Sequence, residues 1–147
     1  MIQALRSAFH RLDPHIAAWM SKHGIAFLRY TLAIIFIWFG ALKPLGISPA
    51  AELVKNTVYW FNGDDFLVIL GVWEVLIGVF LVVPKMTRAA ILLLFLQMPG
   101  TMLPLVLLPE VCFTDFPYGL TLEGQYIIKN LILISAGIVV GGTVRER

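Results

Sequence analysis

Apolar residues fall in four long runs along the chain, and polar residues gather in the connections between them. The runs cover about residues 25–46, 66–84, 89–108 and 124–144. Each is close to the ~20 residues that an α-helix needs to cross ~30 Å of hydrocarbon. The pattern therefore predicts an all-α integral membrane protein, built as a four-transmembrane-helix bundle.

The first 24 residues have a different pattern, because charged residues interrupt them at regular intervals. Their apolar residues repeat at spacings of three and four, which places them on one helical face: Ile2, Leu5, Phe9, Leu12, Ile16 and Trp19. This predicts an N-terminal amphipathic interfacial helix over residues 1–24, on the cytoplasmic side, before a transmembrane domain over 25–147. Asp13 and Pro14 resemble an N-cap and a first helical residue, so we expect two short helices that meet there. A disordered basic tail is the alternative.

Composition agrees with a membrane protein and excludes a water-soluble one. Of the 147 residues, 59% are hydrophobic and 14% are charged, and the mean hydropathy is +0.87. A chain this short has too little interior to hide so much apolar surface, so the excess must face lipid. The formal charge is only +2, without a basic stripe, so no nucleic acid partner is expected. No cleavable signal peptide is expected, because the first apolar run starts late.

Basic residues predict the orientation in the membrane. They border the runs on one side: Arg6, Arg11, Lys22, Arg29, Lys85, Arg88, Arg145 and Arg147. The first and third connections are acidic, with Lys55 as their only basic residue: Glu52, Asp64, Asp65, Glu110, Asp115 and Glu123. The positive-inside rule then puts both termini and the second connection in the cytoplasm, in a bacterial inner (cytoplasmic) membrane. Aromatic residues in the outer connections are expected to be interface anchors, with a lid over the bundle as the alternative.

Glu74 is the most informative residue of the second run. It lies about eight residues into the helix, roughly 12 Å below the outer boundary. An ionisable group at that depth costs at least a few kcal/mol, so it should face the protein interior and have a partner. Gly71 and Gly78 share its helical face. Because glycines let a neighbouring helix approach closely, this face is predicted to be the packed side of the helix.

Four residues are candidate partners at similar depth: Lys129, Asn130, Lys43 and Gln97. Together with Glu74 they are the candidate ligand-binding residues. We expect Glu74 and Lys129 to be the charged pair of a binding or proton-exchange site reached from the outer leaflet. The alternative is a buried ion pair that only fixes helix register. Lys43 is expected to extend to the interface.

Prolines and glycines predict the packing of the last two helices. Pro99, Gly100 and Pro104 should kink the third helix, and we expect the bend to serve packing. The alternative is that the freed backbone carbonyls serve a ligand. Gly137 and Gly141 form a GxxxG motif, which suits close packing within the bundle or across a dimer.

Several chemistries are excluded by the remaining polar residues. The three histidines, His10, His15 and His23, precede the first span, so haem ligation inside the membrane is not available to one chain. No metal-ligand cluster is apparent, and no metal is expected. Cys112 is the only cysteine, which excludes an intramolecular disulfide. We expect an ordinary loop cysteine, with a redox-sensing thiol or an intermolecular link as alternatives.

Three stretches of the chain share residues with a known family. They run from Ile35 to Lys43, from Gly71 to Gly78 and from Phe116 to Asn130. In these stretches the chain resembles DoxX-like four-helix membrane proteins, most of all the reactive-chlorine-resistance (RclC) branch. The resemblance covers roughly residues 25–142. It implies an association with oxidative or chlorine stress, with thiosulfate-quinone chemistry, or with complexes in which such proteins are subunits.

These observations lead us to expect an accessory membrane protein of redox or oxidative-stress homeostasis, rather than an enzyme on its own. It would bind a quinone-like lipophilic ligand in an outer-leaflet polar cavity, and no other cofactor is evident. One alternative is a membrane subunit of a quinone-linked oxidoreductase, which needs an electron-carrying partner. Others are a purely structural subunit of a larger membrane complex and a small transporter that works as an oligomer. The expected partners are the lipid bilayer and a homo-oligomer or a larger membrane complex.

Overall fold

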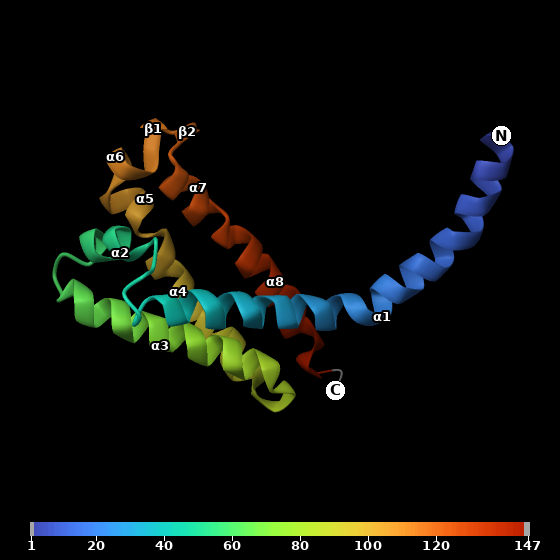
Figure 1. The fold of residues 1–147 in the computed structure, drawn as a ribbon, viewed down its shortest axis with the longest axis horizontal. Coiled ribbons are helices and arrows are strands. Elements are labelled where there is room, and N and C mark those ends of the chain that lie inside the picture. The colour runs from blue at the N-terminus through green and yellow to red at the C-terminus, as the bar shows by residue number, and fades with distance from the viewer. Residues whose placement is uncertain (1, 146–147) are drawn as a thin grey trace.

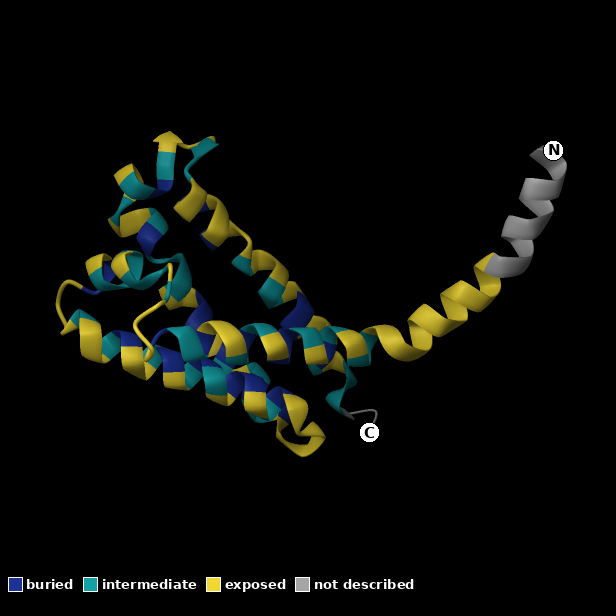
Figure 2. Ribbon diagram, viewed as in Figure 1, coloured by how far each residue is buried: buried dark blue, intermediate teal, exposed yellow. Residues whose placement is uncertain are grey.

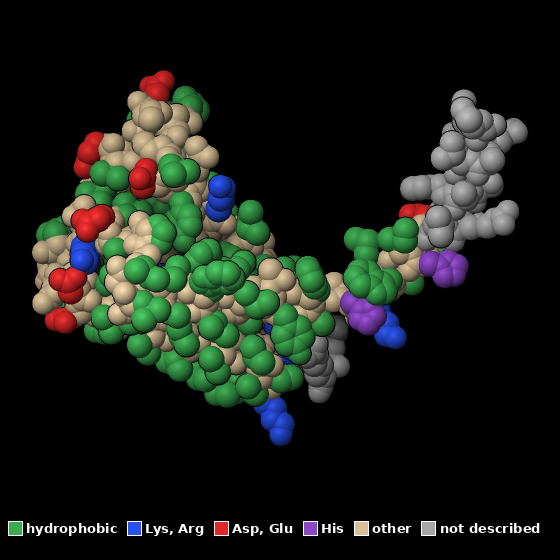
Figure 3. Space-filling view, in the orientation of Figure 1, with side chains coloured by type: hydrophobic (Ala, Val, Ile, Leu, Met, Phe, Trp, Pro, Cys, Tyr) green, Lys and Arg blue, Asp and Glu red, His purple; other side chains and the backbone are tan. Residues whose placement is uncertain are grey.

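Four helical segments long and apolar enough to cross a membrane dominate the computed structural model of the protein. The structure describes residues 2–145, and side chains for residues 13–144. The candidate spans are Asp13–Leu42, Gly63–Val82, Pro84–Leu107 and Leu122–Gly142. Large apolar side chains cover the outside of these spans (Figure 3), and such a surface requires contact with a lipid bilayer. The prediction of a four-helix membrane bundle is confirmed.

Twelve elements follow one another along the described chain. The longer helices are α1 (Ile2–Leu42), α3 (Gly63–Val82), α4 (Thr87–Met102) and α8 (Asn130–Gly142). The shorter elements are α2 (Ala51–Thr57), the 3-10 turn η1 (Pro84–Met86), α5 (Pro104–Leu107), α6 (Pro109–Cys112), α7 (Leu122–Ile128) and the 3-10 turn η2 (Thr143–Arg145). An antiparallel hairpin joins β1 (Phe113–Asp115) to β2 (Gly119–Leu120). Neither α2 nor the hairpin was expected from the sequence.

The N-terminal segment continues the first span without interruption. We expected a break at Asp13 and Pro14, and this was wrong, because α1 is one helix from Ile2 to Leu42 with Pro14 inside it. A proline removes one backbone hydrogen bond and bends a helix, and the long helical stretches on both sides let the helix continue. Figure 1 shows α1 curving away from the bundle. The structure does not describe the side chains of the predicted apolar face from Ile2 to Leu12. The side chains of Arg145 and Arg147 are also outside the described part.

Helices α1 and α3 run antiparallel and form the tightest interface of the bundle. A methyl group added to Gly71 would lie 2.6 Å from the carbonyl oxygen of Gly40. One added to Gly78 would lie 2.7 Å from the carbonyl oxygen of Ala33. The backbones therefore meet where only hydrogen atoms fit. The predicted packed face, which holds Gly71, Glu74 and Gly78, is confirmed, since all three are buried.

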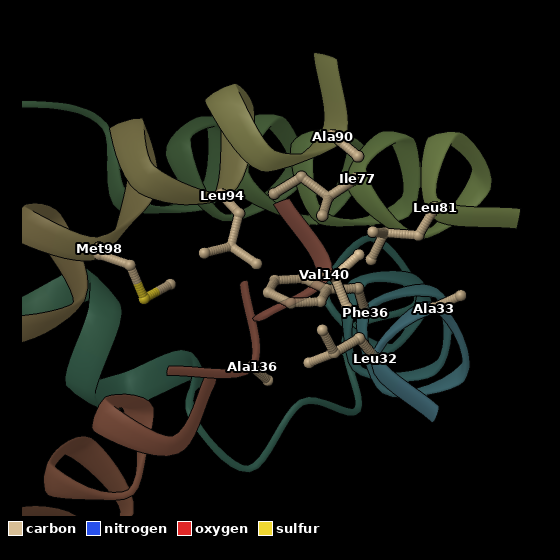
Figure 4. Close-up of a cluster of buried hydrophobic side chains, with 10 residues drawn as sticks. All are labelled: Leu32, Ala33, Phe36, Ile77, Leu81, Ala90, Leu94, Met98, Ala136 and Val140. Atoms are coloured by element: carbon tan, nitrogen blue, oxygen red, sulfur yellow. The ribbon is translucent and has the colours of Figure 1, made fainter. Parts of the chain in front are cut away.

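The apolar core joins all four spans. Its buried side chains come from α1, α3, α4 and α8 and interdigitate in the middle of the bundle (Figure 4); they are Leu32, Ala33, Phe36, Ile77, Leu81, Ala90, Leu94, Met98, Ala136 and Val140. Burial follows one side of each helix, and the opposite side is exposed (Figure 2). The helices pack in a ring in which α1 and α4 both contact α3 and α8.

Short elements close one end of the bundle, which we term the capped end. It is formed by α2, α5, α6 and the β1–β2 hairpin (Figure 1). Side-chain caps start both helices that enter the bundle from it. The Asn62 side chain accepts a hydrogen bond of 3.0 Å from the backbone N–H of Asp64 at the start of α3. Thr121 accepts one of 3.1 Å from the N–H of Gly124 in α7. Such caps satisfy N–H groups that have no partner within the helix.

The third and fourth spans are less regular than predicted. The third was expected over 89–108, but α4 ends at Met102 and short turns follow, because Pro104 and Pro109 each begin a new element. The fourth divides at Lys129 into α7 and α8. Gly137 and Gly141 lie against Leu94 and Ile91 of α4, so the GxxxG motif packs within the bundle.

Charges differ between the two ends of the bundle. Acidic side chains gather at the capped end (Figure 3), and the described ones there are Glu52, Asp64, Asp65, Glu110, Asp115 and Glu123. Lys85 and Arg88, which are exposed, lie at the opposite end, where η1 joins α3 to α4. Between the two ends the surface is mostly hydrophobic (Figure 3).

The glycines of α3 and α8 predict opposite responses to alanine. Gly71→Ala should destabilise the bundle by about 1–3 kcal/mol, because the new methyl group meets backbone and forces α1 and α3 apart. Gly137→Ala should be neutral or slightly stabilising, since its methyl group would lie 3.4 Å from the nearest atom, Cδ2 of Leu94. Thermal unfolding of both variants in the same detergent measures this. Equal melting temperatures would contradict the tight α1–α3 contact.

Candidate functional site

A partly open cavity of about 480 Å³ lies between the helices on the side of the capped end. Side chains of α1, α2, α3 and α4 line it, together with residues of α7 and α8. Most of the lining is apolar or aromatic, and it includes Phe36, Phe39 and Trp73. Ligand sites in proteins are usually concave and mostly apolar with a few placed polar groups, and their volumes fall between about 300 and 1,000 Å³. This cavity has both properties.

Three polar side chains form a hydrogen-bonded cluster at the wall of the cavity. The ammonium group of Lys43 forms an ion pair and a hydrogen bond with Oε2 of Glu74. The other carboxylate oxygen, Oε1, accepts a hydrogen bond of 2.8 Å from Nε2 of Gln97. Lys43 also donates to the backbone carbonyl of Phe39 at 3.4 Å. The exposed fractions of Lys43, Glu74 and Gln97 are 6%, 9% and 9%, so the cluster is shielded from the surroundings.

The glycines of the α1–α3 interface place the charged pair. Lys43 follows Gly40 by three residues, and Glu74 follows Gly71 by three. Because the helices are antiparallel, each glycine faces the charged residue of the other helix. A methyl group on Gly40 would lie 2.8 Å from Cβ of Glu74, and one on Gly71 would lie 2.9 Å from Cβ of Lys43. The small residues thus make room for the ion pair.

The predicted partner of Glu74 was wrong. We expected Lys129, but the carboxylate is paired with Lys43, and Lys129 is exposed and outside the cavity lining. Lys129 stands at the junction of α7 and α8, and its side chain points away from the bundle. The expectation that Lys43 extends to the interface was also wrong, because its side chain is buried. Depth in the membrane was similar for both lysines, but the rotation of each helix decides which one points inward.

Glu74, Lys43 and Gln97 are therefore brought together, and Asn130 lies nearby in the cavity lining. Sequence reasoning missed the aromatic part of this lining, above all Trp60, Trp73 and Tyr126. Trp73 also joins two helices, since its indole N–H donates to the backbone carbonyl of Leu93 at 3.2 Å. A tryptophan in the middle of an apolar run is itself a sequence signal, because a buried indole N–H usually needs a hydrogen-bond acceptor within the protein.

The cluster can hold the polar end of a ligand whose apolar part fills the cavity. Each carboxylate oxygen of Glu74 accepts one hydrogen bond, from Lys43 and from Gln97, so the three side chains hold one another in place. A lysine ammonium has three protons and two have acceptors here, in Glu74 and Phe39. Among the described residues no group of three or more metal-ligating side chains occurs.

Arg29 is a second buried cation, which we had placed among the flanking basic residues. It is only 4% exposed and its guanidinium lies 4.8 Å from the ring centre of Tyr30. Its Nε and Nη1 atoms have no hydrogen-bond partner among the described residues. Arg29 does not line the cavity.

Cys112 is buried at the capped end rather than exposed in a loop. Its side chain is fully covered, and its backbone carbonyl accepts a hydrogen bond of 3.1 Å from the N–H of Thr121. Burial raises the pKa of the Cys112 thiol, and the carboxylates of Glu123 and Glu110 raise it further. The thiol is therefore kept in its less reactive, protonated form.

The ion pair predicts unequal effects of single and double substitutions. Lys43→Met leaves a buried carboxylate without its cation and should destabilise the bundle by about 3–5 kcal/mol. The double variant Lys43→Met/Glu74→Gln removes both charges and should recover much of that loss. Thermal unfolding in detergent compares the variants. If the loss of stability in the double variant equalled the sum of the losses in Lys43→Met and Glu74→Gln, the two side chains would not be coupled.

Cys112 predicts slow alkylation in the folded protein. Since its pKa is raised, the thiolate fraction near neutral pH is smaller in the folded than in the unfolded chain, and the labelling rate should rise only at higher pH. Maleimide labelling followed by mass spectrometry, with and without denaturant, measures this. Tyr118→Cys, at a position that is 90% exposed, provides a reactive control. Equal rates for the folded and denatured Cys112 thiol would contradict the prediction.

Comparison with known proteins adds no assignment to this geometry. No protein-family model, no curated protein and no solved structure matches the chain. The resemblance to DoxX-like proteins therefore stays a prediction from the residues that carry it. The candidate site rests on the cavity and on the Lys43, Glu74 and Gln97 cluster at its wall.

Proposed function

We propose that this membrane protein binds a lipophilic ligand of the quinone type in the cavity at its capped end. One observation carries the proposal: a mostly apolar cavity of about 480 Å³ holds a buried Lys43–Glu74–Gln97 cluster at its wall. The cluster would receive the polar end of the ligand, and the aromatic and aliphatic lining would receive its apolar part. The protein acts as an accessory protein of redox or oxidative-stress homeostasis.

The chemistry of the lining supports a ligand that comes from the bilayer. Aromatic side chains such as Phe39, Trp60 and Trp73 offer flat apolar surfaces, which suit a ring system. The walls of the cavity belong to helices whose outer sides are apolar, so a ligand dissolved in lipid is already close to it. A buried ion pair contributes little net stability compared with apolar residues of similar volume. Its presence beside a cavity favours a binding role over a structural one.

The distribution of charge supports a location for the site. Lys85 and Arg88 lie at the end opposite the capped end, where the acidic residues gather. By the positive-inside rule, the capped end lies on the outer side of a bacterial inner membrane and both termini lie in the cytoplasm. The cavity then lies in the outer half of the bilayer.

The proposed redox role rests only on the resemblance to DoxX-like proteins. A quinone-linked oxidoreductase subunit would use the same cavity, with a partner protein that carries electrons. A purely structural subunit would use the ion pair to fix the register of α1 and α3 and would leave the cavity to bulk lipid. The identity of the molecule in the cavity separates the binding roles from the structural one.

The decisive experiment is mass spectrometry of lipophilic molecules extracted from protein purified in mild detergent. The wild type should retain a quinone-like or isoprenoid molecule in amounts close to one per chain. Lys43→Met/Glu74→Gln should lose most of it, because both charged members of the cluster are gone. Lys129→Met is the matched control, because Lys129 is exposed and outside the cavity lining, so this variant should retain the ligand.

Two results would overturn the proposal. One is that the wild type carries bulk phospholipid only. The other is that the double variant, shown to be folded by circular dichroism and a single elution peak, retains as much of the specific molecule as the wild type. Either result would favour the structural subunit.

A further inference from the structure

The hydrogen bonds of the Gln97 side chain are only half satisfied. Its Nε2 donates to Glu74, but its carbonyl oxygen Oε1 is buried and has no partner in the part of the chain that the structure describes. Gln97 is 9% exposed and lines the cavity. A buried amide oxygen without a hydrogen bond is costly, and most such groups in proteins have a partner. Gln97 thus indicates a hydrogen-bond donor that comes from outside the chain.

The ion pair determines which end of the amide is left without a partner. Glu74 accepts from Lys43 at one oxygen and from Gln97 at the other. A carboxylate with a lysine beside it acts only as an acceptor, so the NH₂ group of Gln97 must turn to Glu74. Reversing the amide would bring two acceptor oxygens together. Lys43 keeps Glu74 an acceptor, and Glu74 in turn orients the Gln97 amide. The carbonyl oxygen of Gln97 is therefore the atom left without a hydrogen bond.

The two threonine hydroxyls of the lining do not supply the missing donor. Thr57 donates its hydroxyl proton to the carbonyl of Leu53 at 2.6 Å, and Thr101 donates its proton to the carbonyl of Met98 at 2.8 Å. Each threonine hydroxyl has one proton. Both side chains thus have only lone pairs left for the cavity. Neither threonine therefore offers a proton to the free oxygen of Gln97.

We infer that the cavity selects ligands that carry a hydroxyl group, as phenols and hydroquinones do, over otherwise equal ligands with a carbonyl or an ether oxygen. The inference rests on the proposed function, because it names the polar group that the ligand brings to the cluster. A hydroxyl donates to the free oxygen of Gln97 and can accept the remaining proton of Lys43. A carbonyl or an ether can only accept. Among quinone-type molecules, the reduced form is the preferred one.

A competition between two matched probes tests this selection. 4-Nonylphenol and 4-nonylanisole differ only by methylation of the oxygen, which removes the donor and keeps the acceptor. Both are added at equal concentration to the protein in detergent, and the amounts bound after desalting are measured by mass spectrometry against protein-free micelles. The wild type should bind the phenol on the order of ten-fold more than the ether, since an unsatisfied buried acceptor opposes the ether.

Two glutamine variants give the matched controls. Gln97→Leu removes the acceptor and should reduce the preference to about that of the micelles. Gln125→Leu makes the same change outside the cavity lining, at an exposed side chain that donates to the carbonyl of Leu120 at 3.5 Å, and should keep the preference of the wild type.

The outcomes separate the inference from the proposed function. If both probes bind the wild type above the micelle level with equal affinity, the inference is overturned and the proposed function stands. If folded Gln97→Leu still preferred the phenol over the ether, the inference would also be overturned, because another group would then bind the hydroxyl. If neither probe binds the wild type above the micelle level, the cavity does not take apolar ligands and both statements fail.

Discussion

A carboxylate inside an apolar bundle needs a partner, and the rest of this structure depends on how Glu74 obtains one. Its cation, Lys43, stands directly after the last residue of α1, the helix that runs antiparallel to α3. The two side chains meet only because the backbones of α1 and α3 are in contact at Gly40 and Gly71. The ion pair therefore requires the glycines, and the glycines allow the apolar core of all four spans to close beside it. A neutral residue at position 74 would need neither a buried lysine nor the close contact of α1 and α3.

Most of the fold follows from the length and composition of the apolar runs. Spans can be predicted in this way because the thickness of the bilayer sets the length of a helix and excludes unpaired backbone groups. The ends of the helices were less predictable. Pro14, between Asp13 and His15, lies inside α1, but Pro104, in an apolar stretch, begins a new element. A proline can either bend a helix or end it, and the proline alone does not decide which of the two occurs.

The depth of the site residues in the membrane could be predicted from the sequence, but the direction in which each side chain points could not. Glu74, Gln97, Lys43 and Lys129 all fall in the same layer of the membrane by counting residues from the ends of the runs. Which of them meet depends on the rotation of each helix about its axis. For α3 the glycines marked the inward side, and that prediction was correct. The same spacing in α1, Gly40 followed by Lys43, was a signal for the true partner. The fourth span had no such marker beside Lys129, which points outward.

The elements at the capped end are short compared with the spans. Helix α2 has seven residues, α5 and α6 have four each, and the hairpin has five residues in strands. Each contains few backbone hydrogen bonds, so local unfolding of these elements costs much less free energy than separating helices of the bundle. Hydrogen exchange at the capped end should then be faster than in α3, and α2 and α5 are the parts of the cavity wall that are displaced most easily while the four spans keep their positions.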